Sequence, residues 1–349
     1  MAQLVTLIPG DGIGPEVTDA ARRVIDASGV EIEWLVRPAG AEHFERHGTP
    51  LPEETVAALR RSRIALKGPI GTPIGGGYRS VNVQLRQMFD LYANFRPVRS
   101  TAGVASRYEN VDLIIVRENT EGLYSGIEHV VVPGVVESLR VVTARGSERI
   151  VRFAFELARA RGRKSVTAVH KANILKLSDG LFLDIARRIA REFPEIEYRE
   201  SIVDATAMKL VLDPAQFDVL VMENLFGDIL SDLASGLAGG LGLAPSANFG
   251  ADAAVFEAVH GSAPDIAGKG VANPTALILS GALMLRHLGQ EGAAELIEGS
   301  VRDVIAAGTV RTRDLGGSAS GADYVSALLE AMRERSRGGG ATWNSSPTR

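Results

Sequence analysis

Short apolar runs alternate with segments of helical periodicity along most of this chain. Runs of branched apolar residues over 3–8, 63–67 and 111–116 predict buried strands. Further strands are predicted at 31–36, 165–169, 197–203 and 217–222, and helices at 52–61, 147–159, 179–191, 224–237, 274–288 and 293–306. Alternation of this kind predicts an α/β protein with mixed sheets.

One segment departs from this alternation. Residues 126–143 contain two β runs on either side of Pro133-Gly134, which predicts a hairpin arm. Such a projecting pair of strands can pair with a partner subunit. The chain has 349 residues, more than one hydrophobic core usually supports, so two lobes are expected.

Composition narrows the class of protein. An apolar fraction of 45% with 23% charged residues is ordinary for a soluble globular protein, and a net charge of −4 gives no reason to expect a nucleic-acid partner. The absence of cysteine excludes disulfides, thiol catalysis and thiolate metal sites. Glycine and proline interrupt the uncharged stretches 233–251 and 270–285, which predicts buried segments and no membrane partner. The N-terminus lacks signal-peptide features, so a cytoplasmic protein is expected.

The glycine-rich stretch after the first strand reads Gly10-Asp-Gly-Ile-Gly-Pro-Glu16. Its third glycine has the wrong spacing for a Rossmann fingerprint, and no acidic residue ends a second strand about 20 residues further on. The Rossmann interpretation is therefore rejected. Two interpretations stay open, a glycine loop of another cofactor architecture or a tight strand-to-helix turn.

Residues 72–96 combine a run of three glycines with polar and cationic side chains. Ser80, Asn82 and Arg86 follow the glycines, and Asn82 and Arg86 share one face of a predicted helix start. Such a face suits a small molecule carrying several carboxylates. The alternative is a solvated, charged helix after a flexible loop.

Two aspartates one helical turn apart give the sharpest local signal. Asp228 and Asp232 lie on one face of the predicted helix 224–237, among apolar residues. Their oxygen ligands favour Mg²⁺ or Mn²⁺, and Asp204 at another strand end is a plausible third ligand. A favourable interaction with the helix dipole could alone explain Asp228, but explains Asp232 less well.

Two other residues are ambiguous when taken alone. Lys171 follows a buried strand and is either a surface residue or, if partly desolvated near other cations, a general base. Tyr124 lies in a loop after the strand that delivers Arg117, and is either a packing residue or a proton donor.

The stretch 259–274 is rich in glycine, serine and proline and carries His260, Asp265 and Asn273. It could wrap an adenine, with Asp265 accepting hydrogen bonds from the ribose hydroxyls and repelling a 2′-phosphate. The alternative is a long connecting loop.

Together these stretches resemble the β-decarboxylating dehydrogenases, the family of isocitrate, isopropylmalate and homoisocitrate dehydrogenases. The resemblance runs from about residue 4 to about residue 328. It is carried by the motifs Gly10-Asp-Gly-Ile-Gly-Pro-Glu16, Arg117-Glu-Asn-Thr-Glu-Gly-Leu-Tyr124, His170-Lys-Ala-Asn173, Gly227-Asp-Ile-Leu-Ser-Asp232 and His260-Gly-Ser-Ala-Pro-Asp265.

The resemblance implies a two-lobed, non-Rossmann fold of this isocitrate/isopropylmalate dehydrogenase type. Residues 1–98 with 250–335 would form the cofactor-binding lobe, and residues 99–249 the substrate, metal and dimerisation lobe. The hairpin near 126–143 would be a clasp between subunits of a homodimer or higher homo-oligomer. Residues 336–349 are expected to be a disordered tail.

The resemblance also assigns roles. Ser80-Val-Asn82-Val-Gln-Leu-Arg86 is similar to the isocitrate pattern, which implies oxidative decarboxylation of isocitrate, a hydroxy-tricarboxylate, with NAD and Mg²⁺ or Mn²⁺. Tyr124 and Lys171 would be catalytic, Lys171 and Asp204 coming from the partner subunit. The substrate-binding residues would be Ser80, Asn82, Arg86, Arg96 and Arg117, the metal ligands Asp204, Asp228 and Asp232, and the NAD-binding residues Thr72, His260, Asp265 and Asn273.

Two departures bear on substrate selectivity, since Ala247 replaces an expected glycine and Tyr78 stands where histidine is common. One alternative is the same chemistry on another 3-substituted malate, such as homoisocitrate, 3-isopropylmalate or a phosphonate analogue. A second alternative is a non-catalytic regulatory subunit, which we would expect to lack part of the metal or acid–base set.

Overall fold

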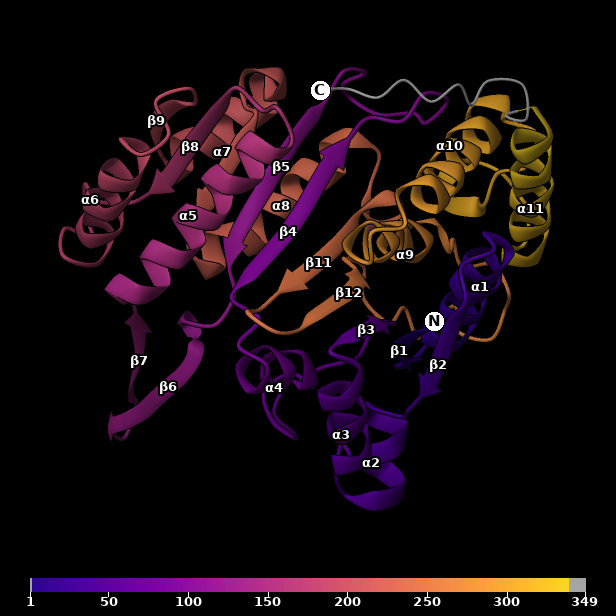
Figure 1. Ribbon diagram of the computed structural model, residues 1–349. Coiled ribbons are helices and arrows are strands. Elements are labelled where there is room, and N and C mark those ends of the chain that lie inside the picture. The colour runs from indigo at the N-terminus through magenta and orange to yellow at the C-terminus, as the bar shows by residue number, and fades with distance from the viewer. Residues whose placement is uncertain (1, 339–349) are drawn as a thin grey trace.

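The computed structural model describes residues 2–338, which form one large sheet, a separate hairpin and helices on both faces of the sheet (Figure 1). The strands are β1 (Gln3–Ile8), β2 (Ile32–Val36), β3 (Ile64–Lys67), β4 (Ala93–Arg99), β5 (Asp112–Glu118), β6 (Gly122–Val132), β7 (Val135–Val141), β8 (Ser165–His170), β9 (Glu197–Ile202), β10 (Val219–Met222), β11 (Pro245–Phe249) and β12 (Ala254–Ala258). The α-helices are α1 (Gly14–Ala27), α2 (Ala41–His47), α3 (Glu53–Ser62), α4 (Val81–Met88), α5 (Ala144–Ala160), α6 (Ser178–Ala190), α7 (Val203–Leu212), α8 (Asn224–Ala238), α9 (Thr275–His287), α10 (Glu291–Ala307) and α11 (Gly321–Gly338).

The large sheet is mixed, as the sequence predicted. Its strand order is β2-β1-β3-β12-β11-β4-β5-β10-β8-β9. The strands on either side are parallel within their own group, whereas β11 runs antiparallel to β12 and β4, and β4 runs antiparallel to β5. Strands β8, β10 and β12 are buried along their whole length because helices cover both faces of the sheet.

Helix α5 illustrates how the sequence builds these layers. The side chain of Thr143 caps its N-terminus by accepting a hydrogen bond from the backbone N–H of Gly146 at 2.9 Å. Its buried apolar residues recur at helical spacing, namely Ile150, Val151, Ala154, Phe155 and Ala158. This face packs on β5, β8 and β10, while α8 packs on β4, β5 and β10 (Figure 1). Strand β5 is therefore covered by both helices, of which α8 carries the predicted site residues Asp228 and Asp232.

The strongly periodic elements predicted from the sequence are present, but several others were missed. The missed elements are α2, α7, α11, β4, β11 and β12. Strand β4 contains Asn94, Arg96 and Pro97, whose polar or proline character hides the strand pattern. Strands β11 and β12 are short and lie in a stretch dominated by alanine, glycine and proline. Segments whose side chains line a site or whose partners are distant carry weak local signals.

The predicted hairpin is present as β6 and β7, which pair only with each other (Figure 1). It carries exposed apolar side chains, including Val130 at 66% exposure and Val136 at 64%. At its base, Arg140 donates a hydrogen bond to Asp179 at 2.5 Å and lies 3.4 Å from the Glu223 carboxylate. The hairpin thus has an anchored base and an apolar outer part.

The first glycine motif forms a tight turn. The carboxylate of Asp11 accepts hydrogen bonds from the backbone N–H of Ala41 at 2.7 Å and of Gly71 at 2.9 Å. Gly10 has φ of +78°, and a Cβ there would lie 2.2 Å from the carbonyl oxygen of Pro69. Of the two interpretations that the sequence left open, this geometry favours the strand-to-helix turn.

The division into two lobes stays a prediction. One buried cluster joins residues between 8 and 91 to Ala253 and Val255, and another lies within residues 98–238. The pairing of β4 with β11 nevertheless continues one sheet through both parts. Residues 336–338 of the predicted tail end α11, and the rest of that tail lies outside the described residues. Within residues 2–338, no helix is both long enough and apolar enough to span a membrane.

A buried ion pair joins two neighbouring parallel strands. Lys67 on β3 is the register partner of Glu257 on β12, and its Nζ lies 2.6 Å from Oε2 of Glu257. Although burial alone would raise the pKa of Glu257, the charges of Lys67 and Arg86 lower this pKa to about 2. Glu257 therefore stays ionised and balances buried positive charge.

We expect Gly10→Ala to lower the free energy of unfolding by about 2 kcal/mol or more, because the new Cβ meets a carbonyl oxygen in a left-handed backbone conformation. Gly29→Ala is the matched control, since Gly29 also has positive φ, at +84°, but has nothing within 4 Å of its ideal Cβ. Urea denaturation of both variants would measure the difference. Equal destabilisation would contradict the close approach to Pro69.

We expect Glu257→Gln to lower the free energy of unfolding by about 3 kcal/mol near neutral pH, because Lys67 loses its buried counter-charge. The depressed folded-state pKa of Glu257 means that its stabilisation is complete above its ordinary pKa of 4.5 and is lost as the pH falls toward about 2. Denaturation of wild type and variant at several pH values would measure this. Glu330→Gln, in an exposed pair with Arg333, should cost under about 0.5 kcal/mol. If the difference in free energy of unfolding between wild type and Glu257→Gln did not shrink at low pH, an ionised Glu257 paired with Lys67 would be contradicted.

Candidate functional site

A cavity of about 230 Å³ lies at the centre of the large sheet, where β3, β12, β11, β4 and β5 meet α4 and α8. Its charged lining consists of four cationic and two carboxylate side chains, which are Lys67, Arg86, Arg96, Arg117, Asp228 and Glu257. Ser80, Asn82, Tyr124, Ser246 and His260 also line it. This excess of positive charge suits a ligand that carries several negative charges.

Helix α4 brings the predicted Ser80, Asn82 and Arg86 to this cavity. Ser80 immediately precedes the helix, and the other two lie one turn apart within it. Arg86 is buried, so the solvated charged helix that the sequence left open is not what forms here. Burial and the neighbouring Arg117 lower the pKa of Arg86. Oδ1 of Asn82 and Nε of Arg86 are buried without a hydrogen-bond partner, and both residues line the cavity. Polar atoms in this state favour a bound ligand.

Strands β4 and β5 supply Arg96 and Arg117 from the neighbouring wall of the cavity. Arg117 donates to Oδ1 of Asn224 from Nε at 2.9 Å and from Nη2 at 2.7 Å, and its Nη1 is bonded to Asp228. A Cβ at Gly227 would lie 2.5 Å from Cγ of Arg117, so glycine is needed for this close approach. Burial, followed by the charge of Arg117, lowers the pKa of Arg96 to about 10.

The two predicted metal ligands on α8 lie side by side at the edge of this cluster. Asp228 lies 3.6 Å from Nη2 of Arg96, and Asp232 accepts a hydrogen bond from Nη1 of Arg96 at 3.0 Å. Burial raises the pKa of Asp228, but Arg117 and Tyr124 outweigh it, so the net pKa is lowered. Burial raises the pKa of Asp232, and Arg96 only partly offsets this.

Tyr124 begins the hairpin and joins the same group. Its hydroxyl donates a hydrogen bond to Oδ2 of Asp228 at 2.5 Å, and the guanidinium of Arg117 lies 5.0 Å from the centre of its ring. Burial and the bond to Asp228 raise the pKa of Tyr124. The phenol therefore stays protonated, which is the state a proton donor requires.

Lys171 and Asp204 lie apart from the cavity within one chain. Lys171 follows β8, Asp204 lies in the first turn of α7, and their side chains form an ion pair with each other. Neither residue lines the central cavity. Their side chains are 28% and 67% exposed, so both are accessible from outside the chain.

The carboxylates fit a divalent metal only in part within one chain. Asp228 and Asp232 supply hard oxygen ligands on one helix face, and their side chains are 37% and 52% exposed. Asp204 is not beside them, and residues 2–338 contain no group of three or more acidic, histidine or cysteine side chains suited to a metal. The donor set therefore fits Mg²⁺ or Mn²⁺ if a third ligand comes from elsewhere.

Of the four predicted NAD-binding residues, only His260 lines the central cavity. Oγ1 of Thr72 donates to the Ser80 hydroxyl at 3.1 Å, and Nε2 of His260 is buried without a partner. Asp265 is exposed. Asn273 is buried, and its amide is already bonded to Thr275 at 3.0 Å and 2.6 Å and to Asp314 at 2.8 Å. These bonds give the Asn273 side chain a structural role, which is to hold the shape of the loop.

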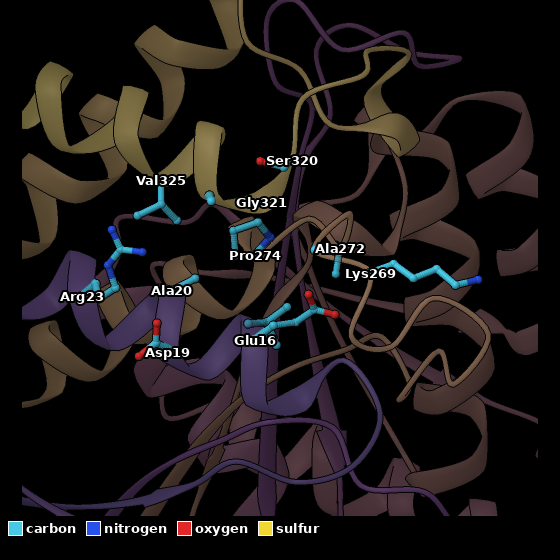
Figure 2. Close-up of a pocket in the computed structure, with 13 residues that line it drawn as sticks. Glu16, Asp19, Ala20, Arg23, Lys269, Ala272, Pro274, Ser320, Gly321 and Val325 are labelled. Atoms are coloured by element: carbon cyan, nitrogen blue, oxygen red, sulfur yellow. The ribbon is translucent and has the colours of Figure 1, made fainter.

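A second cavity, of about 270 Å³, is lined in part by residues of this loop (Figure 2). Lys269, Ala272 and Pro274 line it together with residues of α1 and the start of α11 (Figure 2). The predicted His260, Asp265 and Asn273 do not line it. The loop 259–274 therefore contributes lining residues to both cavities, of which only the central one carries the predicted substrate residues.

Sequence reasoning missed several residues that shape the central cavity, namely Lys67, Glu257, Asn224 and Ser231. Lys67 is the last residue of a buried strand, and Lys171 directly follows another. The sequence signal that singled out Lys171 could therefore also have identified Lys67. Glu257 lies in a strand that the sequence did not predict.

Comparisons with known proteins agree with the geometry of the site. The family model described as isocitrate/isopropylmalate dehydrogenase matches residues 4–329. Catalytic subunit 5 of mitochondrial NAD isocitrate dehydrogenase from Arabidopsis thaliana is 52% identical over 94% of this chain and 88% of that protein. A protein named as a regulatory subunit of the mitochondrial enzyme, from Dictyostelium discoideum, is 51% identical over 95% of this chain and 92% of that protein. The crystal structure of isocitrate dehydrogenase from Methylococcus capsulatus has a TM-score of 0.93 and 56% identity, covering 95% of this chain and 100% of that one.

These findings correct one expectation and confirm another. The cytoplasmic location expected from the N-terminus is contradicted, because the two relatives are named as mitochondrial proteins. The resemblance stated from the motifs is confirmed over nearly the whole chain, together with the non-Rossmann α/β fold. The chain belongs to the isocitrate/isopropylmalate dehydrogenase family.

Proposed function

We propose that this protein is an NAD-dependent decarboxylating dehydrogenase that converts isocitrate to 2-oxoglutarate and CO₂ in a metal-dependent reaction. The observation that carries the proposal is the cluster of Arg86, Arg96 and Arg117 around one cavity, beside Tyr124 and Asp228. Three guanidinium groups match the three carboxylates of isocitrate in charge. The names of the relatives support the same substrate and cofactor.

The polar start of α4 would select the substrate. Ser80 and Asn82 would hold the distal carboxylate of isocitrate, while Arg86 binds its charge from the next turn of the helix. The unpartnered Oδ1 of Asn82 and Nε of Arg86 support this, because a ligand would satisfy both atoms. An apolar 3-substituent would leave them unsatisfied, which favours isocitrate over 3-isopropylmalate.

Asp228 and Asp232 of one chain, with Asp204 of a second chain, would hold Mg²⁺ or Mn²⁺. When bound, the metal supplies Lewis acidity to oxygen atoms of the substrate. The residues themselves are suited to this role because they provide oxygen ligands and remain accessible beside the arginines. Asp204 is paired with Lys171 and is the most exposed of the three.

Two residues would transfer protons to or from the substrate. Lys171, from the partner subunit, would take the hydroxyl proton of isocitrate, directly or through water or Asp204, as hydride leaves the same carbon. Tyr124 would protonate the carbon that loses CO₂. Its raised pKa and its position beside Asp228 support the role of donor.

NAD would accept the hydride. Thr72 lies against Ser80 and would be beside the nicotinamide, while His260 and Asp265 would contact the adenosine. The exposed carboxylate of Asp265 can accept hydrogen bonds from both ribose hydroxyls and would repel a 2′-phosphate. Asn273 would act mainly by holding the loop, since its amide is already bonded.

This arrangement would require a homodimer or higher homo-oligomer with shared sites. The exposed valines of β6 and β7 offer an apolar surface for a clasp between subunits. The ion pair of Lys171 and Asp204 faces outward and could complete the site of a second copy. The relatives are named as subunits of isocitrate dehydrogenase, which supports an oligomer.

A non-catalytic regulatory subunit is the second candidate, because one relative is named as a regulatory subunit. Against it, Tyr124, Lys171, Asp204, Asp228 and Asp232 are all present. A third candidate keeps the chemistry but acts on another 3-substituted malate.

Steady-state kinetics of the purified protein with isocitrate, homoisocitrate and 3-isopropylmalate, each with NAD and NADP, would test the proposal. We expect kcat/KM for isocitrate with NAD to exceed every other combination by about tenfold or more, and chelation of divalent metal to abolish turnover. Equal use of NADP would contradict the cofactor assignment. Preference for another acid would favour the third candidate, and no turnover with any acid would favour the regulatory subunit.

Subunit mixing would test whether the sites are shared. We expect Lys171→Met and Asp228→Asn each to lower kcat by about 100-fold or more. A mixed dimer of the two variants contains one site with both defects and one intact site, so it should regain about half of wild-type activity. Mixing Lys171→Met with Asp204→Asn is the control, because both residues would be donated to the partner and no intact site forms. If neither mixture regained activity, active sites shared between subunits would be contradicted.

A further inference from the structure

An unbroken chain of buried hydrogen bonds joins the cavity residues Arg96 and Glu257, and no role assigned so far explains it. Nε of Arg96 donates to Oδ1 of Asn94 at 2.8 Å, and Nδ2 of Asn94 donates to Oδ1 of Asn248 at 2.9 Å. Nδ2 of Asn248 then donates to Oε1 of Glu257 at 2.8 Å. Asn94 and Asn248 are register partners on β4 and β11, and are 0% and 1% exposed.

The chemistry at both ends fixes the direction of this chain. Arg96 can only donate, so the carbonyl oxygen of the Asn94 side chain must face it. The NH₂ group of Asn94 must then face the oxygen of Asn248, and the NH₂ group of Asn248 must face Glu257. An ionised carboxylate can only accept, and the low pKa of Glu257 keeps it in that state. Neither amide can reverse without losing bonds at both of its ends.

Asn248 and Arg86 face the same oxygen of Glu257, and Asn248 is the one that donates a hydrogen bond to it. Oε2 of Glu257 is bonded to Lys67 at 2.6 Å, whereas Oε1 faces both Asn248 and Arg86. Nη2 of Arg86 lies 3.7 Å from Oε1, within reach of an ion pair but beyond a hydrogen bond. Arg86 is thus attracted toward Glu257 without being bound by it.

We propose that Asn248 is a positioning residue, which satisfies Oε1 of Glu257 and so keeps the Arg86 guanidinium available for a substrate carboxylate. This inference rests on the proposed function, because it assigns Arg86 to the substrate. Without the Asn248 donor, Oε1 of Glu257 takes Arg86 as its hydrogen-bond partner. The guanidinium is then held by Glu257 and is less free to bind a substrate carboxylate, so isocitrate binds more weakly.

The test compares Asn248→Ala and the isosteric Asn248→Asp with wild type in steady-state kinetics. Both variants lose the donor to Glu257, and the aspartate also repels that carboxylate. We expect KM for isocitrate to rise about tenfold or more, as for the loss of one hydrogen bond to a charged group. We expect kcat to fall less than about twofold and KM for NAD to stay unchanged, since Tyr124 and Asp228 are not touched.

Asn119→Ala is the matched control. Nδ2 of Asn119 also donates to Oδ1 of Asn248, at 2.9 Å, and Asn119 is equally buried at 2% exposure. Its loss removes a bond to the same amide but leaves the bond between Asn248 and Glu257 in place. We expect a similar fall in the thermal midpoint with KM for isocitrate within about twofold of wild type.

A KM that rises equally in the Asn119 and Asn248 variants would overturn the proposal, because loosening of the amide cluster would then explain it. Failure of both Asn248 variants to fold where Asn119→Ala folds would also overturn it, by assigning Asn248 to stability. Wild type without turnover on isocitrate would instead contradict the proposed function. The two failures are therefore distinguishable.

Discussion

The gathering of four cationic side chains around one small cavity is the constraint on which the rest of this structure depends. Lys67, Arg86, Arg96 and Arg117 are each largely removed from water, which is costly unless their charges are balanced and their donors bonded. Glu257, Asp228 and Asp232 balance these charges. The side-chain amides of Asn94 and Asn248 link Arg96 to Glu257 by hydrogen bonds. The balance is incomplete within the cavity, so binding of an anionic ligand is favoured there.

This constraint explains local features that would otherwise look irregular. Strand β4 carries polar residues inside a buried sheet because two of them, Asn94 and Arg96, belong to the network. Gly227 lies in the first turns of α8 because the stem of Arg117 passes where a Cβ would be. Oδ1 of Asn82, Nε of Arg86 and Nε2 of His260 are buried without a hydrogen-bond partner, and all three residues line the central cavity.

The described chain assembles its predicted site in two separate groups. The arginines, Tyr124, Asp228 and Asp232 meet around the central cavity, whereas Lys171 and Asp204 pair with each other elsewhere. No local pattern could have revealed this separation, because each of the five predicted acid–base and metal residues either follows a strand or lies on the helix that follows one. The distinction depends on which edge of the sheet each strand occupies. Burial likewise decided between the two interpretations of α4, since a charged helix and an anion-binding helix have the same spacing of polar residues.

The sequence by itself determined the α/β alternation, the hairpin about Pro133-Gly134, the pairing of Asp228 with Asp232 and the family motifs. These features depend on neighbours within one turn of helix or one strand, where spacing alone places side chains on a face. Only the tertiary structure decided that Lys67 meets Glu257, that Asn94 meets Asn248 and that Asn273 meets Asp314. These contacts join residues far apart along the chain, and their partners are set by strand order and register, which local patterns do not encode.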